Sequence, residues 1–272
     1  MKHDTFDKYP PGGLDLAQQA LLTTWDCLSD YREDLVLVGG LAVRLLTHRA
    51  DEGLPDAVTI DVDFGISIGA SGGMYGSIKQ TLSGHGFRWD GNRFSREFGE
   101  MPLFLDLLTD DDKADVGSAV LDDSLSVSIV PGISRALAQS RIVRISGTTL
   151  LGVEQTEDVR VAEIGPMLVL KLNAFAGRKA VKDAHDIAYL AMNYLDGIED
   201  AIAGFAEEKT AGNRGMKRAL QTLQDHFGNA SAQGPMSCAA FRMNNEHLLV
   251  ARADESLQIR QQCVTLAQAL LG

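Results

Sequence analysis

Cysteine is scarce in this chain, whose 272 residues include only Cys27, Cys238 and Cys263. Their number is odd, they are scattered, and none has the paired spacing of a zinc site or of a disulfide framework. These features argue against a zinc-finger protein and against a disulfide-stapled secreted domain. We therefore expect three free thiols with structural roles.

Long apolar runs are also missing. The longest apolar stretches fall well short of the about 20 residues that a transmembrane helix needs, so no membrane partner is expected. The first residues contain a lysine, but no apolar segment follows it, and nothing there predicts a secretory signal peptide. We expect a cytoplasmic protein.

Positive charge is in short supply as well. The chain has 25 lysine and arginine residues against 37 aspartate and glutamate residues, which gives a formal net charge of -12. Such a charge opposes a broad nucleic-acid-binding surface, so a nucleic-acid partner would need a local basic patch. The charge would suit a cationic small molecule, although acidic proteins are often acidic only for solubility.

Hydrophobic residues make up 45% of the chain, which is enough for a sizeable core. Helical and strand-like patterns alternate in the first half, and from Pro166 onward the pattern is almost wholly helical. The elements that position the candidate site are a helix over 14–30, a strand over 35–38, a helix over 41–48, and strands over 58–68 and 103–108. We predict an α+β fold with an α/β core over residues 1–160, in which helices flank a mixed sheet, and a C-terminal helical domain over residues 161–272.

Two acidic residues interrupt the apolar strand over 58–68. Asp61 and Asp63 are two positions apart, so the strand period of two places both on one face, about 7 Å apart. Val62 and Phe64 point to the other face. Carboxylates so close repel each other unless a cation neutralises them, and a divalent metal ion is the natural partner.

Asp106 is a third acid with large apolar residues on either side. A buried carboxylate is costly unless it is paired or bound to metal. If its strand lies beside the one with Asp61 and Asp63, the three carboxylates converge and suit two Mg²⁺ ions that bridge substrate phosphates. A lone Asp-x-Asp more often reflects strand-end acids that meet solvent or a lysine, but the combination favours a functional site.

Gly39 and Gly40 end the strand over 35–38 and precede a helix. Their backbone amides are thus available to the oxygens of a triphosphate. A double glycine alone usually means a tight turn, and its weight here comes from the acids that follow.

Four segments resemble a known family. They are Val38-Gly39-Gly40-Leu41-Ala42, Thr59-Ile60-Asp61-Val62-Asp63-Phe64, Leu105-Asp106-Leu107, and residues 171–187, which contain Lys171, Arg178, Lys182-Asp183 and Asp186-Ile187 in that order. The first three are similar to motifs of the DNA-polymerase-β-like nucleotidyltransferase superfamily. The fourth points to its AbiEii-type toxin nucleotidyltransferases, and the resemblance spans residues 38–187.

The resemblance implies a nucleotidyltransferase fold and a role for each matched residue. Asp61, Asp63 and Asp106 would be the catalytic and metal-binding carboxylates, whereas Gly39, Gly40, Lys171 and Arg178 would contact the nucleotide. Without the family, the basic residues of 171–187 and the acids beside them are equally well explained as a solvated helix face with salt bridges.

The implied function is a Mg²⁺-dependent nucleotidyltransferase that moves a nucleotide from an NTP to RNA, in particular to the tRNA 3′ end, in a toxin-like role with an antitoxin protein as a possible partner. A second hypothesis keeps the enzyme and replaces RNA with a small cationic acceptor such as an aminoglycoside. A third is a catalytically inactive binding module of the same fold. Three acids kept in apolar strands argue against the third.

Overall fold

The chain forms two compact units. The computed structural model describes residues 5–10, 12–48, 57–67, 76–99, 101–122, 125–243, 250 and 252–272. The sheet unit consists of Pro11–Leu45 and Thr59–Glu163, and the helical unit of Met1–Pro10, Leu46–Val58 and Ile164–Gly272. The predicted domain boundary lay between residues 160 and 161. The units change at Glu163, and two N-terminal segments go with the helices.

The sheet unit is built on one mixed sheet. Its described strands are β1 (Leu35–Val38), β2 (Asp61–Ile66), β3 (Arg88–Trp89), β4 (Phe94–Phe98), β5 (Met101–Thr109), β6 (Ser118–Asp122), β7 (Leu125–Ile129), β8 (Ser140–Thr148) and β9 (Glu154–Ala162). Their order is β3-β4-β5-β2-β1-β9-β8, with β7 paired to β5 and β6 to β7. Both parallel and antiparallel pairs occur, so the predicted mixed sheet is confirmed.

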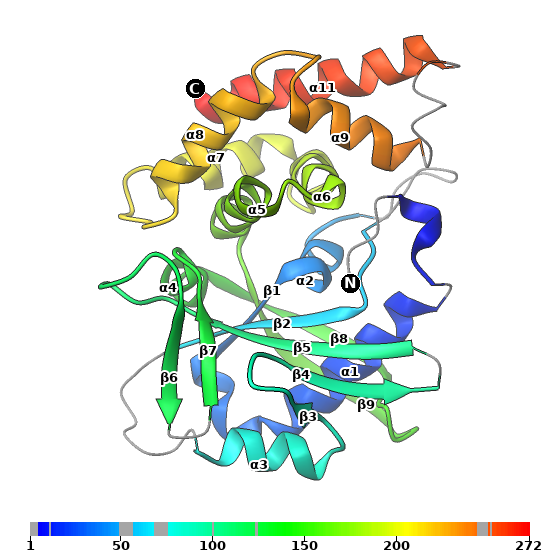
Figure 1. The fold of residues 1–272 in the computed structure, drawn as a ribbon, viewed down its shortest axis with the longest axis vertical. Coiled ribbons are helices and arrows are strands. Elements are labelled where there is room, and N and C mark those ends of the chain that lie inside the picture. The colour runs from blue at the N-terminus through cyan, green and yellow to red at the C-terminus, as the bar shows by residue number, and fades with distance from the viewer. Residues whose placement is uncertain are drawn as a thin grey trace. The chain divides into compact units, whose positions relative to one another are not determined.

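Helices cover both faces of this sheet (Figure 1). They are α1 (Gly13–Cys27), α2 (Gly39–Leu45), α3 (Gly76–Gly84) and α4 (Ile133–Ala138), with a 3₁₀ turn over Ser29–Asp34. On one face, Trp25 of α1 packs against Phe64 of β2, with ring centroids 5.8 Å apart. On the other, Ile133 of α4 lies so close to Gly65 that a Cβ there would come within 2.9 Å of it. The predicted flanking of the sheet by helices is thus confirmed.

The strand period decides which side chains enter the core. In β2, Val62 and Phe64 are fully buried beneath α1, whereas Asp61 and Asp63 lie on the opposite face and are partly exposed. The same alternation runs through β5, where every second residue from Leu103 is buried. The acids are therefore confined to the face on which α2 and α4 pack.

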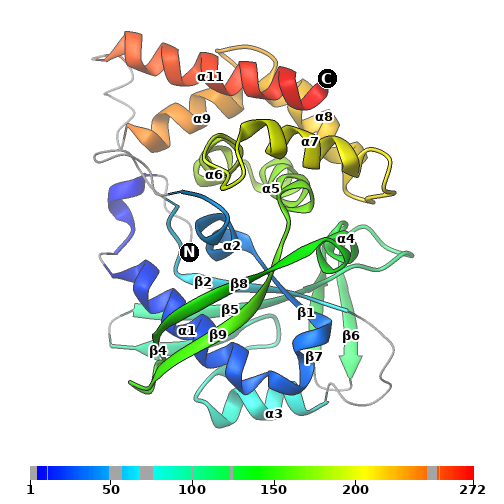
Figure 2. The ribbon, with the colours of Figure 1, turned by 180° about the vertical axis from the view of Figure 1, so that it is seen from behind.

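The helical unit is a bundle (Figure 2). Its described elements are a 3₁₀ turn (Phe6–Lys8), α5 (Ile164–Arg178), α6 (Val181–Met192), α7 (Ile198–Glu208), α8 (Met216–Phe227), α9 (Gln233–Arg242) and α11 (Ala253–Leu271). Helices α5 and α7 meet where Gly165 faces Gly204, and a Cβ on Gly165 would overlap the Gly204 carbonyl. Buried aromatic side chains, such as Phe175, Phe205 and Phe227, fill the core.

The cysteines and the lengths of the helices also bear on the predictions. Cys27, Cys238 and Cys263 all carry free thiols, as predicted. Across the described ranges, no helix combines the length and the apolar character that crossing a bilayer requires.

Candidate active site

The strands that carry the three acids are neighbours. β2 runs parallel to β5 in a register that sets Asp63 beside Asp106 and Asp61 beside Phe104. Because side chains at paired positions of adjacent strands point to the same face, the three carboxylates lie on one face of the sheet. The structure therefore brings together Asp61, Asp63 and Asp106.

The glycine turn lies against this group. Gly39 begins α2 directly after β1, which pairs with β2 so that Val38 lies beside Asp63. A Cβ on Gly39 would overlap the carboxylate of Asp63, and the residue has a φ of 74°, in the left-handed region that favours glycine. A Cβ on Gly40 would come within 2.6 Å of the Thr59 side chain. Both glycines are thus needed for close packing of the turn against the strand that carries the acids.

Arg93 is a functional candidate that the sequence analysis missed. Its Nη2 donates a hydrogen bond to Asp106 Oδ2 at 2.8 Å and lies 3.7 Å from Asp61 Oδ1. The guanidinium carbon also lies 4.1 Å from the centre of the Phe104 ring, in a cation–π contact. Arg93 therefore bridges carboxylates of two strands.

Two polar atoms of this group have no hydrogen-bond partner although they are buried. They are Asp61 Oδ1 and Arg93 Nε. An unsatisfied buried polar atom costs about 1–3 kcal/mol. The group is thus incompletely satisfied, which is typical of a site that a ligand completes.

The donor atoms fit a hard divalent cation, although their present arrangement does not. Among the residues that the structure describes, no three His, Cys, Asp or Glu side chains are grouped so that they could hold a metal ion. In this arrangement the Arg93 guanidinium lies between Asp61 and Asp106, at 3.7 Å from Asp61 Oδ1 and 2.8 Å from Asp106 Oδ2. The donors themselves are carboxylate oxygens, which Mg²⁺ prefers, and Asp61 Oδ1, which no group hydrogen-bonds, is available as a ligand.

The electrostatic strain is concentrated on Asp106. Burial and, to a smaller extent, the neighbouring charge of Asp63 outweigh the opposing effect of Arg93 and together raise the pKa of Asp106 from 3.8 to about 6. At neutral pH the group thus remains anionic in an environment that disfavours its charge. A bound cation would relieve this cost.

This shift predicts a pH-dependent stability of the metal-free protein. Because the folded-state pKa of about 6 lies above the ordinary 3.8, the stabilising contribution of protonated Asp106 is full below about pH 4 and is lost as the pH rises through 6. We expect the free energy of unfolding of Asp106→Asn, relative to wild type, to rise by about 1–3 kcal/mol between pH 4 and 7.5. Urea unfolding in the presence of a chelator measures this difference, and a difference independent of pH would contradict the assignment.

Lys171 is buried within the helical unit. It is 5% exposed, and its Nζ donates a hydrogen bond to Asp186 Oδ2 at 2.7 Å. Lys182 donates to the same oxygen at 2.6 Å. Burial alone would raise the pKa of Asp186, but the two ammonium groups outweigh it and hold this pKa below its ordinary value. The salt bridges expected for a solvated face are thus present, but in the core.

Arg178 is more accessible than Lys171. Its Nε donates to Asp183 Oδ2 at 2.5 Å and its Nη2 to Asp183 Oδ1 at 2.8 Å, while its side chain is 48% exposed. The guanidinium of Arg178 is thus reachable from solvent, whereas the ammonium of Lys171 is not. The predicted contacts of Lys171 and Arg178 with a nucleotide stay predictions.

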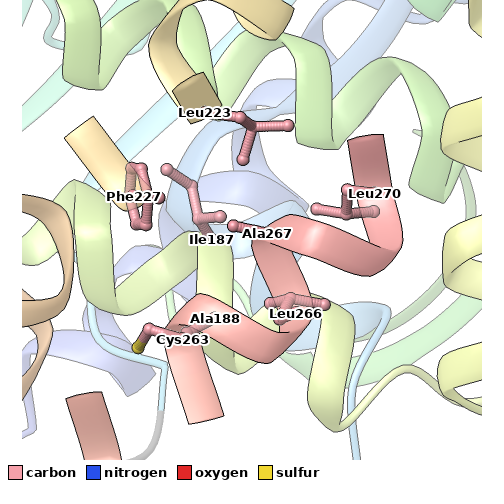
Figure 3. A pocket seen from close by; sticks show the side chains of 8 residues that line it. All are labelled: Ile187, Ala188, Leu223, Phe227, Cys263, Leu266, Ala267 and Leu270. Atoms are coloured by element: carbon pink, nitrogen blue, oxygen red, sulfur yellow. The ribbon is translucent and has the colours of Figure 1, made fainter. Parts of the chain in front are cut away.

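An apolar pocket lies between α6, α8 and α11 (Figure 3). Its lining includes Ile187, Leu223, Phe227 and Leu270, and apart from the Cys263 thiol the side chains are hydrocarbon. A nucleotide needs charged and hydrogen-bonding partners, so this pocket is unsuited to one.

Comparison with protein-family models gives no match for this chain, and no curated protein matches it in sequence.

Proposed function

We propose that this chain is a nucleotidyltransferase that moves a nucleotide from an NTP to an acceptor, with Mg²⁺ as its cofactor. The observation that carries the proposal is the parallel pairing of β2 with β5, which sets Asp63 beside Asp106 and keeps Asp61 on the same face. The raised pKa of Asp106 and the Asp61 oxygen that no group hydrogen-bonds add support, because both indicate a group that awaits a cation.

In this proposal each part of the sheet unit has a separate task. Asp61, Asp63 and Asp106 would hold two Mg²⁺ ions, and the backbone amides of Gly39 and Gly40 would bind the triphosphate. When bound, Mg²⁺ neutralises phosphate oxygens and lowers the pKa of the attacking hydroxyl. The acceptor oxygen forms a bond to the α-phosphorus, the bond from that phosphorus to the bridging oxygen breaks, and pyrophosphate leaves.

The chain's own contribution is therefore positioning. The three carboxylates are fixed by two paired strands, and strands hold side chains more rigidly than loops do. Both predicted contacts in the helical unit are paired with an aspartate, and Arg178 is the better candidate because its side chain is 48% exposed whereas that of Lys171 is buried.

RNA is the proposed acceptor, as the family resemblance implies, with a toxin-like role and an antitoxin as partner. An acidic chain needs a local basic patch for this, and in the helical unit Lys179 and Arg218 are the candidate pair of cations. Lys179 Nζ lies 2.6 Å from His226 Nε2. Burial lowers the pKa of Lys179, and the nearby charge of Arg218 lowers it further, although Asp225 opposes both. Burial and the charge of Lys179 also lower the pKa of His226, so its neutral ring accepts the Lys179 hydrogen bond, and the positive charge here comes from Lys179 and Arg218.

A small cationic acceptor is the second candidate. The formal net charge of -12 favours it, because an acidic surface attracts cations over a distance of about 10 Å at ordinary salt.

One transfer experiment distinguishes an RNA acceptor from a small cationic acceptor. The protein is incubated with Mg²⁺ and each α-labelled NTP, together with total RNA in one series and a panel of aminoglycosides in another. Label in RNA, concentrated in tRNA, is expected. Label on an aminoglycoside would support the second acceptor instead. If calorimetry detects no Mg²⁺-dependent binding of any NTP and no label moves, the chain is an inactive module and the proposed function is wrong.

A further inference from the structure

Arg93 holds its place among the carboxylates through two local features. First, β4 and β5 are antiparallel, with Phe94 beside Leu105 and Ser95 beside Phe104, and continuing this register by one residue sets Arg93 opposite Asp106. Second, Asp90 Oδ1 accepts hydrogen bonds from the backbone nitrogens of Asn92 and Arg93, at 2.8 and 2.9 Å, which fixes the turn before β4. The backbone of Arg93 is thus fixed beside the acids.

The side chain of Arg93 is less completely engaged than its backbone. Only Nη2 donates to Asp106, and Nε is buried without a partner. The pair of Arg144 with Asp158 shows what full engagement looks like in this protein, because Nε and Nη2 each donate to a different carboxylate oxygen, at 2.8 and 2.9 Å. Arg93 therefore neutralises the acids without being locked to them.

A divalent ion would compete well for the same oxygens. At equal dielectric constant, a double charge at the metal–oxygen distance of about 2.1 Å attracts a carboxylate about 2.7 times as strongly as a single charge at the 2.8 Å of Arg93. The ion would also use Asp61 Oδ1, which has no hydrogen-bond donor. Metal binding would thus release the guanidinium from both acids.

We propose that Arg93 is an exchangeable counter-cation. It neutralises Asp61 and Asp106 in the metal-free protein, leaves them when a divalent cation binds, and then donates to a phosphate of the nucleotide. This inference rests on the proposed function and adds to it a positioning residue for the triphosphate.

Phe104 would keep the Arg93 guanidinium close to the carboxylates during such an exchange. The guanidinium lies over its ring, and this contact depends on neither Asp61 nor Asp106, so it persists when the carboxylates turn to a metal ion. The planar fork of donors matches phosphate oxygens as well as it matches carboxylates. Arg93 therefore stays beside the metal site, where the triphosphate would lie.

The test compares binding of Mn²⁺ alone to wild type and to Arg93→Gln by isothermal titration calorimetry. Because the substitution removes the competing charge, we expect Arg93→Gln to bind Mn²⁺ about tenfold more tightly. In saturating Mn²⁺, the same variant should bind each of ATP, CTP, GTP and UTP more weakly than wild type does, by about tenfold for the preferred NTP. Arg93→Lys keeps the charge but not the fork, and should resemble wild type for Mn²⁺ and Arg93→Gln for the nucleotide.

Arg96→Gln is the matched control. Arg96 lies on β4, three residues after Arg93, but its Nη1 donates to the carbonyl of His85 at 2.8 Å, so its removal should leave Mn²⁺ affinity unchanged. If wild type binds Mn²⁺ and Arg93→Gln binds it equally well or more weakly, Arg93 does not compete with the metal ion. That result overturns the proposed exchange but leaves the proposed function unaffected. Tighter Mn²⁺ binding with unchanged NTP affinity overturns the phosphate contact. A wild type that binds neither Mn²⁺ nor any NTP overturns the proposed function, and the inference with it.

Discussion

Asp63→Asn is expected to reduce nucleotide transfer at least about a thousandfold while it leaves the fold intact. The substitution deletes one ligand charge and hardly changes the volume of the side chain. Asp63 packs against Gly39, where no Cβ fits, so an isosteric residue is required and a larger one would displace the turn. Transfer of label from an α-labelled NTP measures the loss, and circular dichroism confirms the fold.

Glu97→Gln is the control for this experiment. Glu97 is an exposed acid on β4, next to the strand that carries Asp106, and its loss changes the net charge by the same amount. We expect normal transfer from Glu97→Gln. Normal turnover by Asp63→Asn in the presence of Mg²⁺ would remove Asp63 from the mechanism.

Asp186→Asn is expected to destabilise the protein by about 3–5 kcal/mol, because it leaves the ammonium groups of Lys171 and Lys182 buried without a counter-charge. Urea unfolding monitored by circular dichroism measures the change. Asp158→Asn breaks an exposed pair with Arg144 and should leave the free energy of unfolding almost unchanged.

The charges of Lys171, Lys182 and Asp186 make a second variant informative. One aspartate faces two lysines, so Lys171→Met leaves Asp186 and Lys182 as a balanced pair. We therefore expect Lys171→Met to cost less than half of what Asp186→Asn costs. If Lys171→Met were the more damaging of the two, packing around the lysine stem, and not charge balance, would determine the stability of this region.

The convergence of the acids could be predicted because it depends on a short-range rule. The period of two in a strand fixes the face of Asp61 and Asp63 from the sequence alone, and the apolar flanks of Asp106 mark a second strand. The predicted strand over 35–38 agrees with β1, and that over 103–108 lies within β5. Adjacency of the two acidic strands was an additional assumption, which the parallel pairing confirms.

Arg93 could not be found in this way. Its contact with Asp106 depends on the register between β4 and β5, and that register follows from the length of the connection between the strands. An arginine at the start of a strand that pairs with an acidic strand was the available signal.

The burial of Lys171 could not be predicted from the sequence either. Spacings of three and four residues show which side chains share a helix face, as for Lys182 and Asp186, but not whether that face is covered by another helix.

The sequence also could not predict where segment Leu46–Val58 belongs. It is part of the helical unit, although its sequence neighbours belong to the sheet unit. Thr47 forms a β-bridge with Tyr194, and the backbone nitrogen of His48 donates to the carbonyl of Asn193 at 2.9 Å. These partners are about 150 residues away along the chain, beyond the reach of any local pattern.

The position of β1 in the sheet has a consequence for synthesis on the ribosome. Leu37 of β1 pairs in parallel with Val161 of β9, a residue made 161 − 37 = 124 positions later. At a translation rate of about 5–20 residues per second, one edge of β1 stays without its neighbour for about 6–25 s. During that time an apolar strand with unpaired backbone groups is exposed to other nascent chains, and a chaperone that binds extended apolar segments would have its clearest target at Leu35–Val38.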